Sequence, residues 1–573
     1  MFRVNQSQGG RRTSRLHISD YAVYATLGIT LFAITVGFDK LNPRNIAWLL
    51  FNDQVTHWIG WRFFAESRWE WPPGANTAYG WESTTSIIAT DSWPLFALIF
   101  KILQLPGFDK GQYFGLGYLA GSVALTLGSA RLLAGFAVIG IKRFMGVIII
   151  VTVPMFWYMH QWYPALSGGM ALLVWAFCLY FEDLRRSEVA TVGWTLLLVI
   201  GVSTQFYLFA ILCVIYGVTL LQCWDRDKWK RFVAANSLVL LLVLVVMYLL
   251  GYFMIPLTRA STGSGYGEFS ANLLAPIDSE GSSRWLFDLP STAQQYEPTF
   301  VGLGAVVLMF CLVFTRRMNV RHDLRHLVHR HKILAVALAL MSVVAVSNII
   351  TLGEWSFRVP IPVAVEQALS VFRSSVRFVW PLILMIVVSA ILLVVRHLPK
   401  ATLCLLFAAS FQILDVSGAI ETVSERPNGR ESVVQFDEEL WKKVPFQYEI
   451  VAQHPAGNYK EGWAECAYAA LSTSRSAQCA YLARIINLTE FNLRREISLE
   501  NGRPSTDTIY LFDYEWVKTH AGLLLSTYNN GRHGFTLTSS GVLMFPECQR
   551  FQSCSFLQDS RMSVQQVVAK AGL

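Results

Sequence analysis

The sequence predicts a polytopic all-α membrane protein whose chain ends in a soluble α/β domain. Of its 573 residues, 53% are hydrophobic and only 15% are charged, whereas an average soluble domain is roughly 25% charged. Apolar runs of about 20 residues, the length that crosses a hydrocarbon core, recur up to residue 416 and are missing after it. We therefore expect an N-terminal segment (1–18), a transmembrane domain (19–416) and a soluble C-terminal domain (417–573).

About eleven apolar runs are candidate membrane spans. They lie near residues 19–38, 112–139, 144–159, 166–182, 189–203, 205–223, 233–255, 298–315, 333–352, 377–395 and 401–416. The first run is not followed by a small-residue cleavage site, so we expect it to be retained as a span. Long loops at 39–111 and 256–297 interrupt the series. The apolar stretch from Trp93 to Leu105 is too short to span, which predicts a helix that lies in the membrane interface or re-enters it.

The distribution of basic residues predicts the orientation. Positive charge precedes the first span and recurs in every second loop, at Arg3, Arg11, Arg12, Arg15, Lys142, Arg143, Arg185, Arg186, Arg226, Lys228, Lys230, Arg231, in the run from Arg316 to Lys332, and at Arg396 and Lys400. Because positively charged loops stay on the cytoplasmic side, the N-terminus is expected in the cytoplasm. An odd number of spans then places the C-terminal domain on the outer face.

The cysteines agree with an outer C-terminal domain. Cys178, Cys213, Cys223, Cys311 and Cys404 lie in or beside apolar spans, as buried small hydrophobes do. The other four form two pairs close in sequence, which is typical of an oxidising compartment. We predict the disulfides Cys466–Cys479 and Cys548–Cys554, with four free thiols as the alternative.

The C-terminal region is predicted to have a mixed α/β fold. Strand-like apolar runs occur at Ile509 to Phe512 and Val542 to Phe545, and a helical pattern occurs near Gly462 to Leu471. The turn Asn529-Asn530-Gly531 favours a hairpin.

Motifs of soluble enzymes are missing from the sequence. It contains no G-x-x-x-x-G-K-[ST], no H-E-x-x-H and no G-x-S-x-G, which disfavours ATP-driven transport and zinc hydrolysis. The cluster Gly263 to Gly267 favours a flexible loop over a phosphate cradle. The histidine-rich run Arg321 to His331 contains a single carboxylate, Asp323, so a basic helix that faces lipid headgroups is favoured over a metal site.

The first outer loop differs in kind because tryptophans and carboxylates alternate in it. Aromatic faces beside carboxylates suit a sugar ligand, whereas an interfacial aromatic belt needs no ligand. Asp53 and His57 would share one helix face at positions i and i+4, where a carboxylate could serve as a general base. The tryptophans are Trp48, Trp58, Trp61, Trp69, Trp71, Trp81 and Trp93.

Several segments together resemble a family of bacterial polytopic proteins grouped with the GT-C glycosyltransferases. They cover most of the membrane part, in order: Asn52 to Phe64, Trp71 to Asn76, Thr90 to Leu95, His160 with Ala165 to Gly168, Ala271 to Asp278, Gln295 to Glu297, Ser347-Asn348, Leu352-Gly353, Phe372 to Pro381, Phe411 to Asp415 and, more weakly, Tyr481 to Arg484. The chain departs from the family pattern at Met159, where an arginine precedes the histidine in the family, and at Gly168-Gly169.

The resemblance implies a transferase that moves a sugar from a polyprenyl-phosphate donor on the periplasmic face of the bacterial inner membrane. An envelope glycan or a lipid would accept the sugar. No cofactor is required with certainty, and a divalent cation would be compatible with the reaction. In this superfamily an acid of the first outer loop commonly serves as base or substrate anchor, and Asp53 occupies the matching position.

The predicted site combines the resemblance with the chemistry of the reaction. Asp53 and Asp91 are the catalytic candidates, because the acceptor hydroxyl must lose a proton. Arg373 and Arg377 are placed to grip the leaving phosphate, although arginines there could instead anchor the span at headgroups. The remaining substrate-binding candidates are His57, Trp58, Trp61, Arg62, His160, Asn272 and Glu297, with Trp93 also available to stack on sugar or cover lipid. We expect Asp53, Asp91, Asn272, Arg373 and Arg377 to line one outward-facing cavity.

Two other classes of function remain open. A carrier or flippase for lipid-linked saccharides, with an outer docking domain, should carry ionisable residues deep in its spans. Here the charges lie mostly at span ends, with Arg131 as the exception. A structural partner in an envelope assembly would be favoured if the aromatic loop has no ligand.

Overall fold

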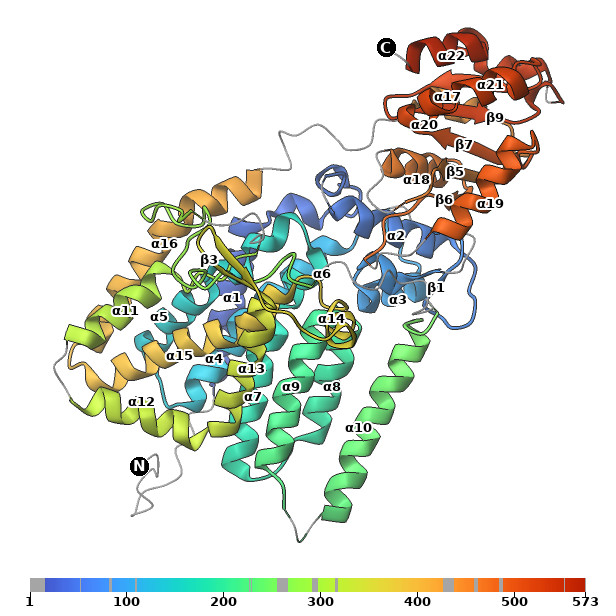
Figure 1. Cartoon of the computed structure of the whole chain (residues 1–573). Helices are drawn as coiled ribbons and strands as arrows, with labels where there is room; N and C mark the ends of the chain where they lie inside the picture. Colours follow the sequence, from blue (N-terminus) through green and yellow to red (C-terminus); the bar gives the residue numbers. More distant parts are fainter. Residues whose placement is uncertain are drawn as a thin grey trace.

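The structure is a computed structural model that describes residues 16–51, 53–81, 85–108, 111–225, 227, 229–254, 266–290, 297–314, 318–425, 437–457, 462–483, 488–550 and 552–571. A helical bundle forms most of the molecule, and a domain with a central sheet stands at one end of it (Figure 1). Several residues named above lie outside the described part of the chain: the arginines before residue 16, Arg226, Lys228, Gly263 to Gly265, Gln295, Tyr296, Arg316 and Arg484.

Six helices in the described part of the chain are long and apolar enough to cross a membrane. They are α1 (Ile18–Thr35), α4 (Phe114–Gly135), α6 (Pro164–Gly169) continued by α7 (Ala171–Arg186), α10 (Trp229–Leu249), η7 (Ser375–Val379) continued by α15 (Trp380–His397), and α16 (Ala401–Glu425). Two bent pairs would raise the number to eight. One joins α5 (Gly140–Val151) to η4 (Pro154–Phe156) and η5 (Tyr158–Gln161) with a 69° bend, and the other joins α12 (Met318–Arg330) to α13 (Lys332–Val346) with an 87° bend.

The prediction of eleven spans is therefore too high. Three of the predicted runs form shorter helices, α8 (Thr191–Val202), α9 (Phe206–Gln222) and α11 (Leu303–Phe314), of 12, 17 and 12 residues. At 1.5 Å per residue a 12-residue helix is about 18 Å long, well below a hydrocarbon core of about 30 Å.

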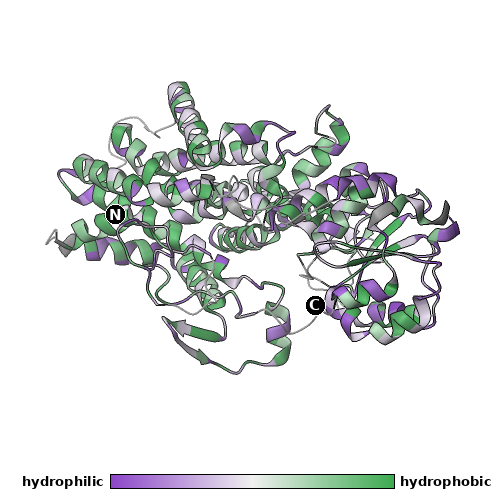
Figure 2. Cartoon of the chain, turned by 90° about the horizontal axis from the view of Figure 1, so that it is seen from above, coloured by the Kyte–Doolittle hydropathy of each residue, from purple (hydrophilic) through white to green (hydrophobic). Residues whose placement is uncertain are grey.

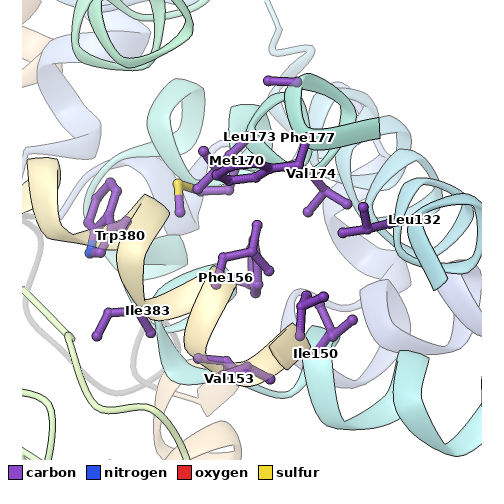
Figure 3. Packing of buried hydrophobic residues seen from close by; sticks show 14 of the residues in the cluster. Leu132, Ile150, Val153, Phe156, Met170, Leu173, Val174, Phe177, Trp380 and Ile383 are labelled. Atoms are coloured by element: carbon purple, nitrogen blue, oxygen red, sulfur yellow. The ribbon is translucent and has the colours of Figure 1, made fainter. Parts of the chain in front are cut away.

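The bundle is held by one large apolar core. Figure 3 shows part of it, where side chains from α4, α5, η4, α7 and α15 converge: Leu132, Ile150, Val153, Phe156, Met170, Leu173, Val174, Phe177, Trp380 and Ile383. Their convergence packs α15 and α7, which are far apart in sequence, against the same interior. Figure 2 shows hydrophobic residues through the bundle and more hydrophilic residues on the surface of the C-terminal region.

The first long loop folds into short elements. It contains η1 (Phe38–Leu41), η2 (Ala47–Leu49), α2 (Gln54–Glu66), a two-stranded ladder of β1 (Ala75–Asn76) and β2 (Thr85–Ser86), η3 (Ile87–Thr90) and α3 (Pro94–Leu103). Nearly all of α2 is buried. The ten-residue α3 confirms the expected short apolar helix.

The second long loop contacts an exposed hairpin that follows α13 (Lys332–Val346). Strands β3 (Ile349–Leu352) and β4 (Trp355–Arg358) pair antiparallel, and α14 (Val363–Leu369) follows them. Asn272 ties the loop to this hairpin, because its side chain donates to the carbonyl of Gly353 at 2.8 Å and accepts from the Gly353 amide at 3.0 Å.

The C-terminal domain has the predicted α/β character. Its five-stranded sheet has the order β6 (Ser476–Gln478), β5 (Ile450–His454), β7 (Thr508–Phe512), β9 (Val542–Phe545) and β8 (Gly534–Leu537). Strands β6, β5 and β7 are parallel, and β9 runs antiparallel to both β7 and β8. The helices are α17 (Glu438–Lys443), α18 (Trp463–Ser472), α19 (Thr489–Glu500), α20 (Tyr514–Thr519), α21 (Ala521–Tyr528), η9 (Cys548–Arg550), η10 (Gln552–Ser560) and α22 (Val564–Ala571).

Both predicted disulfides are present in this domain. One joins Cys466 of α18 to Cys479 just after β6, and the other joins Cys548 to Cys554. The five cysteines of the apolar segments are free thiols, and three of them are only partly buried.

The C-terminal domain packs directly on the first loop. The Ala477 amide donates to the carbonyl of Ala78 at 2.9 Å, and the Gly80 amide donates to the carbonyl of Ala477 at 3.0 Å. The ring of Trp58 on α2 lies 5.9 Å from the ring of Tyr468 on α18. One apolar core contains residues of both regions, so the two regions form a continuous packed unit.

Candidate functional site

A cavity of about 470 Å³ lies where α2, the segments around residues 163 and 207, η7 and the C-terminal domain meet. Four of the five residues predicted to share a cavity line it, namely Asp53, Asp91, Arg373 and Arg377. The other lining residues are Thr56, His57, Thr90, Met159, Trp162, Tyr163, Ala165, Leu166, Gln205, Tyr207, Phe269, Glu297, Ser374, Tyr481 and Ala483. Segments that are distant in sequence therefore supply both acids and bases to one site.

Asp53 stands at the start of α2 and is partly exposed. It occupies the N-cap position, yet its side chain makes no capping hydrogen bond. The hydroxyl of Tyr163 donates to this carboxylate instead. Burial and the neighbouring Asp53 charge both raise the pKa of Tyr163 well above its usual value, while Arg377 opposes the shift, so this phenol is a hydrogen-bond donor and stays protonated.

His57 lies one turn further along α2, and one hydrogen bond holds its ring while another holds its backbone. Its Nδ1 lies 2.9 Å from the carbonyl oxygen of Thr90, and the Ser92 hydroxyl donates to the His57 carbonyl at 2.6 Å. A carbonyl can only accept a hydrogen bond, so Nδ1 carries the proton in the neutral ring and Nε2 has a free lone pair.

The Thr90–Trp93 turn approaches α2 closely because of a glycine. A Cβ at Gly60 would collide with the side chain of Thr90. Asp91 and Trp93 adopt left-handed backbone conformations with φ of 49° and 53°, which are uncommon for residues other than glycine. This turn presents Asp91 to the cavity beside α2.

Arg377 forms the most deeply buried ion pair of the site. Its Nε lies 2.8 and 2.9 Å from the two carboxylate oxygens of Glu297, and the two side chains are only 6% and 3% exposed. Its guanidinium also stacks over the rings of Tyr163 at 5.2 Å and Tyr207 at 4.4 Å. The charge of Arg377 is therefore neutralised and held in place by the protein itself.

Arg373 is held more loosely. Its Nε and Nη2 donate to Glu268 at 3.0 and 3.1 Å, and its guanidinium lies 4.6 Å from the ring centre of Phe269. The Glu268 side chain is 50% exposed and that of Arg373 is 29% exposed. Because exposed ion pairs contribute little free energy, an incoming anion could displace Glu268 far more easily than Glu297.

The C-terminal domain closes one side of the cavity. Tyr481 and Ala483 line it, just beyond the disulfide-bonded Cys479. The Ala483 amide donates to the carbonyl of Ala89 at 2.7 Å, which ties this segment to η3.

The tryptophans predicted to bind sugar are core residues. Trp58 and Trp61 are each 1% exposed, and their indole nitrogens both donate to the carbonyl of Gly111, at 3.3 and 3.2 Å. Trp93 is 4% exposed, and its ring occupies space that a Cβ at Gly168 would fill. None of the three lines the cavity, because their rings pack within the core of the first loop.

Three other predicted residues also lie away from this cavity. His160 is buried, hydrogen-bonds the Ser167 hydroxyl and lines a separate small cavity. Arg62 pairs with Glu66 in the next turn of α2 and stacks on Trp58. Asn272 supports the second loop as described above. The prediction that Asn272 lines the shared cavity is therefore wrong. Glu297 does line the cavity, where it is the ion-pair partner of Arg377.

Sequence reasoning missed several lining residues. Tyr163, Gln205 and Tyr207 are polar residues that line the cavity but lie in none of the segments on which the family resemblance rests. Thr56 also lines the cavity and lies within the Asn52–Phe64 segment, but its residue type gave no reason to choose it as a site residue. Within the described ranges, no group of three or more His, Cys, Asp or Glu side chains could hold a metal ion.

Comparison with known proteins identifies the family. Residues 25–417 match the family described as Domain of unknown function (DUF6311), and the chain belongs to it. No curated protein and no solved structure matches the chain. The matched region contains α2, η3 and η7, whereas Tyr481 and Ala483 lie beyond it.

Proposed function

We propose that this member of the DUF6311 family is an integral-membrane glycosyltransferase of the GT-C type. It takes a sugar from a polyprenyl-phosphate donor and transfers it to an envelope glycan or lipid on the periplasmic face of the bacterial inner membrane. The N-terminus is then cytoplasmic and the C-terminal domain periplasmic, an orientation that requires an odd number of spans and that rests on the basic loops and the disulfides in place of the count of eleven. The observation that carries the proposal is the cavity that joins Asp53 and Asp91 to Arg373 and Arg377.

The composition of the cavity suits the chemistry of sugar transfer. The acceptor hydroxyl must lose a proton, and the α2 wall offers the Asp53 carboxylate, our first candidate for the base. A base within hydrogen-bond reach accelerates such a step by about 10²–10⁴-fold. The leaving lipid phosphate gains negative charge, which Arg373 can meet with a fork of N–H donors after Glu268 is displaced.

The position of the cavity also supports the proposal. The cavity lies near α2 and the C-terminal domain, and the basic helix α12 lies at the opposite end of the bundle (Figure 1). Under the positive-inside rule the α12 end is cytoplasmic. The two disulfides of the C-terminal domain fit the oxidising environment outside the cytoplasm.

The alternative of a carrier is less well supported. Arg131, the charge within a predicted span, is paired by Glu182 at 2.8 Å. Both residues lie in the last turns of their helices, α4 and α7. This pair is placed as an end anchor and not as part of a central transport path.

The test is a transfer assay with the purified full-length chain in lipid nanodiscs. Labelled undecaprenyl-phosphate sugars are supplied with envelope glycans and lipids as acceptors. We expect transfer by the wild type, and a large loss in Asp53→Asn or Asp91→Asn, which keep shape while removing charge. Failure of every donor in the wild type, together with movement of lipid-linked saccharides across proteoliposomes, would favour the carrier.

A further inference from the structure

Two polar atoms on the α2 wall have no hydrogen-bond partner. Among the described residues, neither His57 Nε2 nor Thr56 Oγ1 has a hydrogen-bond partner, although both atoms are buried. Each residue is 4% exposed, and both line the cavity. Leaving a buried polar atom unpaired costs about 1–3 kcal/mol, so such atoms at a cavity wall are typical of sites that a ligand completes.

The two atoms are chemically complementary to a hydroxyl group. With Nδ1–H committed to Thr90, Nε2 of the neutral His57 ring can only accept. The Thr56 hydroxyl can both donate and accept. A ligand hydroxyl could therefore donate to Nε2, and a hydroxyl of the same ligand could pair with Thr56 Oγ1.

We propose that Thr56 and His57 form the subsite for the acceptor hydroxyl, and that His57 Nε2 takes its proton. This inference rests on the proposed sugar transfer and moves the role of proton acceptor from Asp53, the first candidate above, to His57. Asp53 lies one helical turn away on the same cavity wall, so its carboxylate is near the positive charge that forms on His57 during transfer. The hydrogen bond from Tyr163 holds the Asp53 carboxylate in place.

The step balances without any other reactant. The acceptor oxygen forms a bond to the anomeric carbon as its proton moves to Nε2. The bond between the anomeric carbon and the phosphate oxygen breaks, and its electron pair leaves with the lipid phosphate. The imidazolium keeps its Nδ1 proton on the Thr90 carbonyl and returns the new proton from Nε2 to water or to the released phosphate.

The arrangement predicts which variant removes which function. His57→Asn places an amide nitrogen where Nδ1 stood, so it keeps the bond to Thr90 while removing Nε2. Thr56→Val removes only the hydroxyl. Thr351 provides a matched control, because its Oγ1 is also buried and unpaired but lies in β3, away from the cavity.

We expect His57→Asn to lower kcat by about 10²–10⁴-fold with little change in donor KM. Thr56→Val should raise acceptor KM by about tenfold, the effect of one hydrogen bond of roughly 1.4 kcal/mol. Thr351→Val should leave both constants unchanged.

The transfer rates of the single variants separate His57 from Asp53, the other candidate for the base on this wall. If His57→Asn retains activity while Asp53→Asn abolishes transfer, Asp53 is the base and the inference is overturned. A wild type without transfer activity would instead refute the proposed function.

Discussion

The two walls of the cavity differ in how their polar groups are satisfied. On the α2 wall, Nε2 of His57 and Oγ1 of Thr56 are buried without partners. On the arginine wall, Arg377 and Arg373 are each paired with a carboxylate of the protein, Glu297 and Glu268. The described part of the α2 wall therefore leaves two buried polar atoms unpaired, whereas the charges of the arginine wall are paired within the protein.

The two ion pairs of the arginine wall differ in their exposure to solvent. The Arg377–Glu297 pair is almost fully buried, whereas the Arg373–Glu268 pair is half open to solvent. Breaking a buried pair leaves a charge without compensation, but exchanging an exposed partner costs little. Arg377 is suited to hold the architecture and Arg373 is suited to meet a ligand.

The largest expected effect is on stability. It tests whether the buried ion pair and the exposed ion pair of the arginine wall differ in their contribution to folding. Arg377→Ala leaves Glu297 buried and unpaired, which should lower the free energy of unfolding by about 3–5 kcal/mol. Arg373→Ala, the matched change at the open pair, should cost less than about 1 kcal/mol. Thermal unfolding of the detergent-solubilised chain, followed by intrinsic fluorescence, measures both, and equal losses would contradict the assignment.

The next effect concerns the donor. Arg373→Ala should raise donor KM by about 10–100-fold, because a charge-assisted hydrogen bond to phosphate contributes roughly 1.5–3 kcal/mol. Glu268→Gln removes the competing carboxylate charge and should lower donor KM. A donor KM that does not respond to either change would place the phosphate elsewhere in the cavity.

The smallest expected effect tests the tryptophans. Trp58→Phe removes the N–H that donates to Gly111 and should cost on the order of 1–2 kcal/mol of stability. The KM values for donor and acceptor should stay the same, because the ring packs against Tyr468 and away from the cavity. A rise in either KM at unchanged stability would restore the sugar-stacking role predicted from the sequence.

The sequence predicted which loops meet at the cavity, but it did not predict which of their charged side chains form ion pairs with each other. Charge alternation and the resemblance brought Asp53, Asp91, Arg373 and Arg377 together, and all four line the cavity. Glu297 was predicted as a substrate contact, yet it is the buried partner of Arg377. Ion pairing depends on side-chain geometry between distant segments, which neither composition nor spacing encodes.

The same limit explains the errors in the fold. Alternating aromatics and acids in the first loop suggested sugar-binding faces, whereas Trp58, Trp61 and Trp93 form the core between that loop and its neighbours. The apolar runs of α8 and α11 were found in the right places, but each forms a helix of only 12 residues. Cysteine pairing was predictable because four residues close in sequence left few alternatives.

The most direct test is a structure of the chain in nanodiscs with a polyprenyl-phosphate sugar analogue that cannot react. We predict that its phosphate lies within hydrogen-bond distance of the Arg373 guanidinium, with Glu268 displaced and the Arg377–Glu297 pair intact. The sugar should then face Thr56 and His57. An analogue bound outside this cavity, or bound in it with the phosphate turned away from Arg373 and toward α2, would contradict the account.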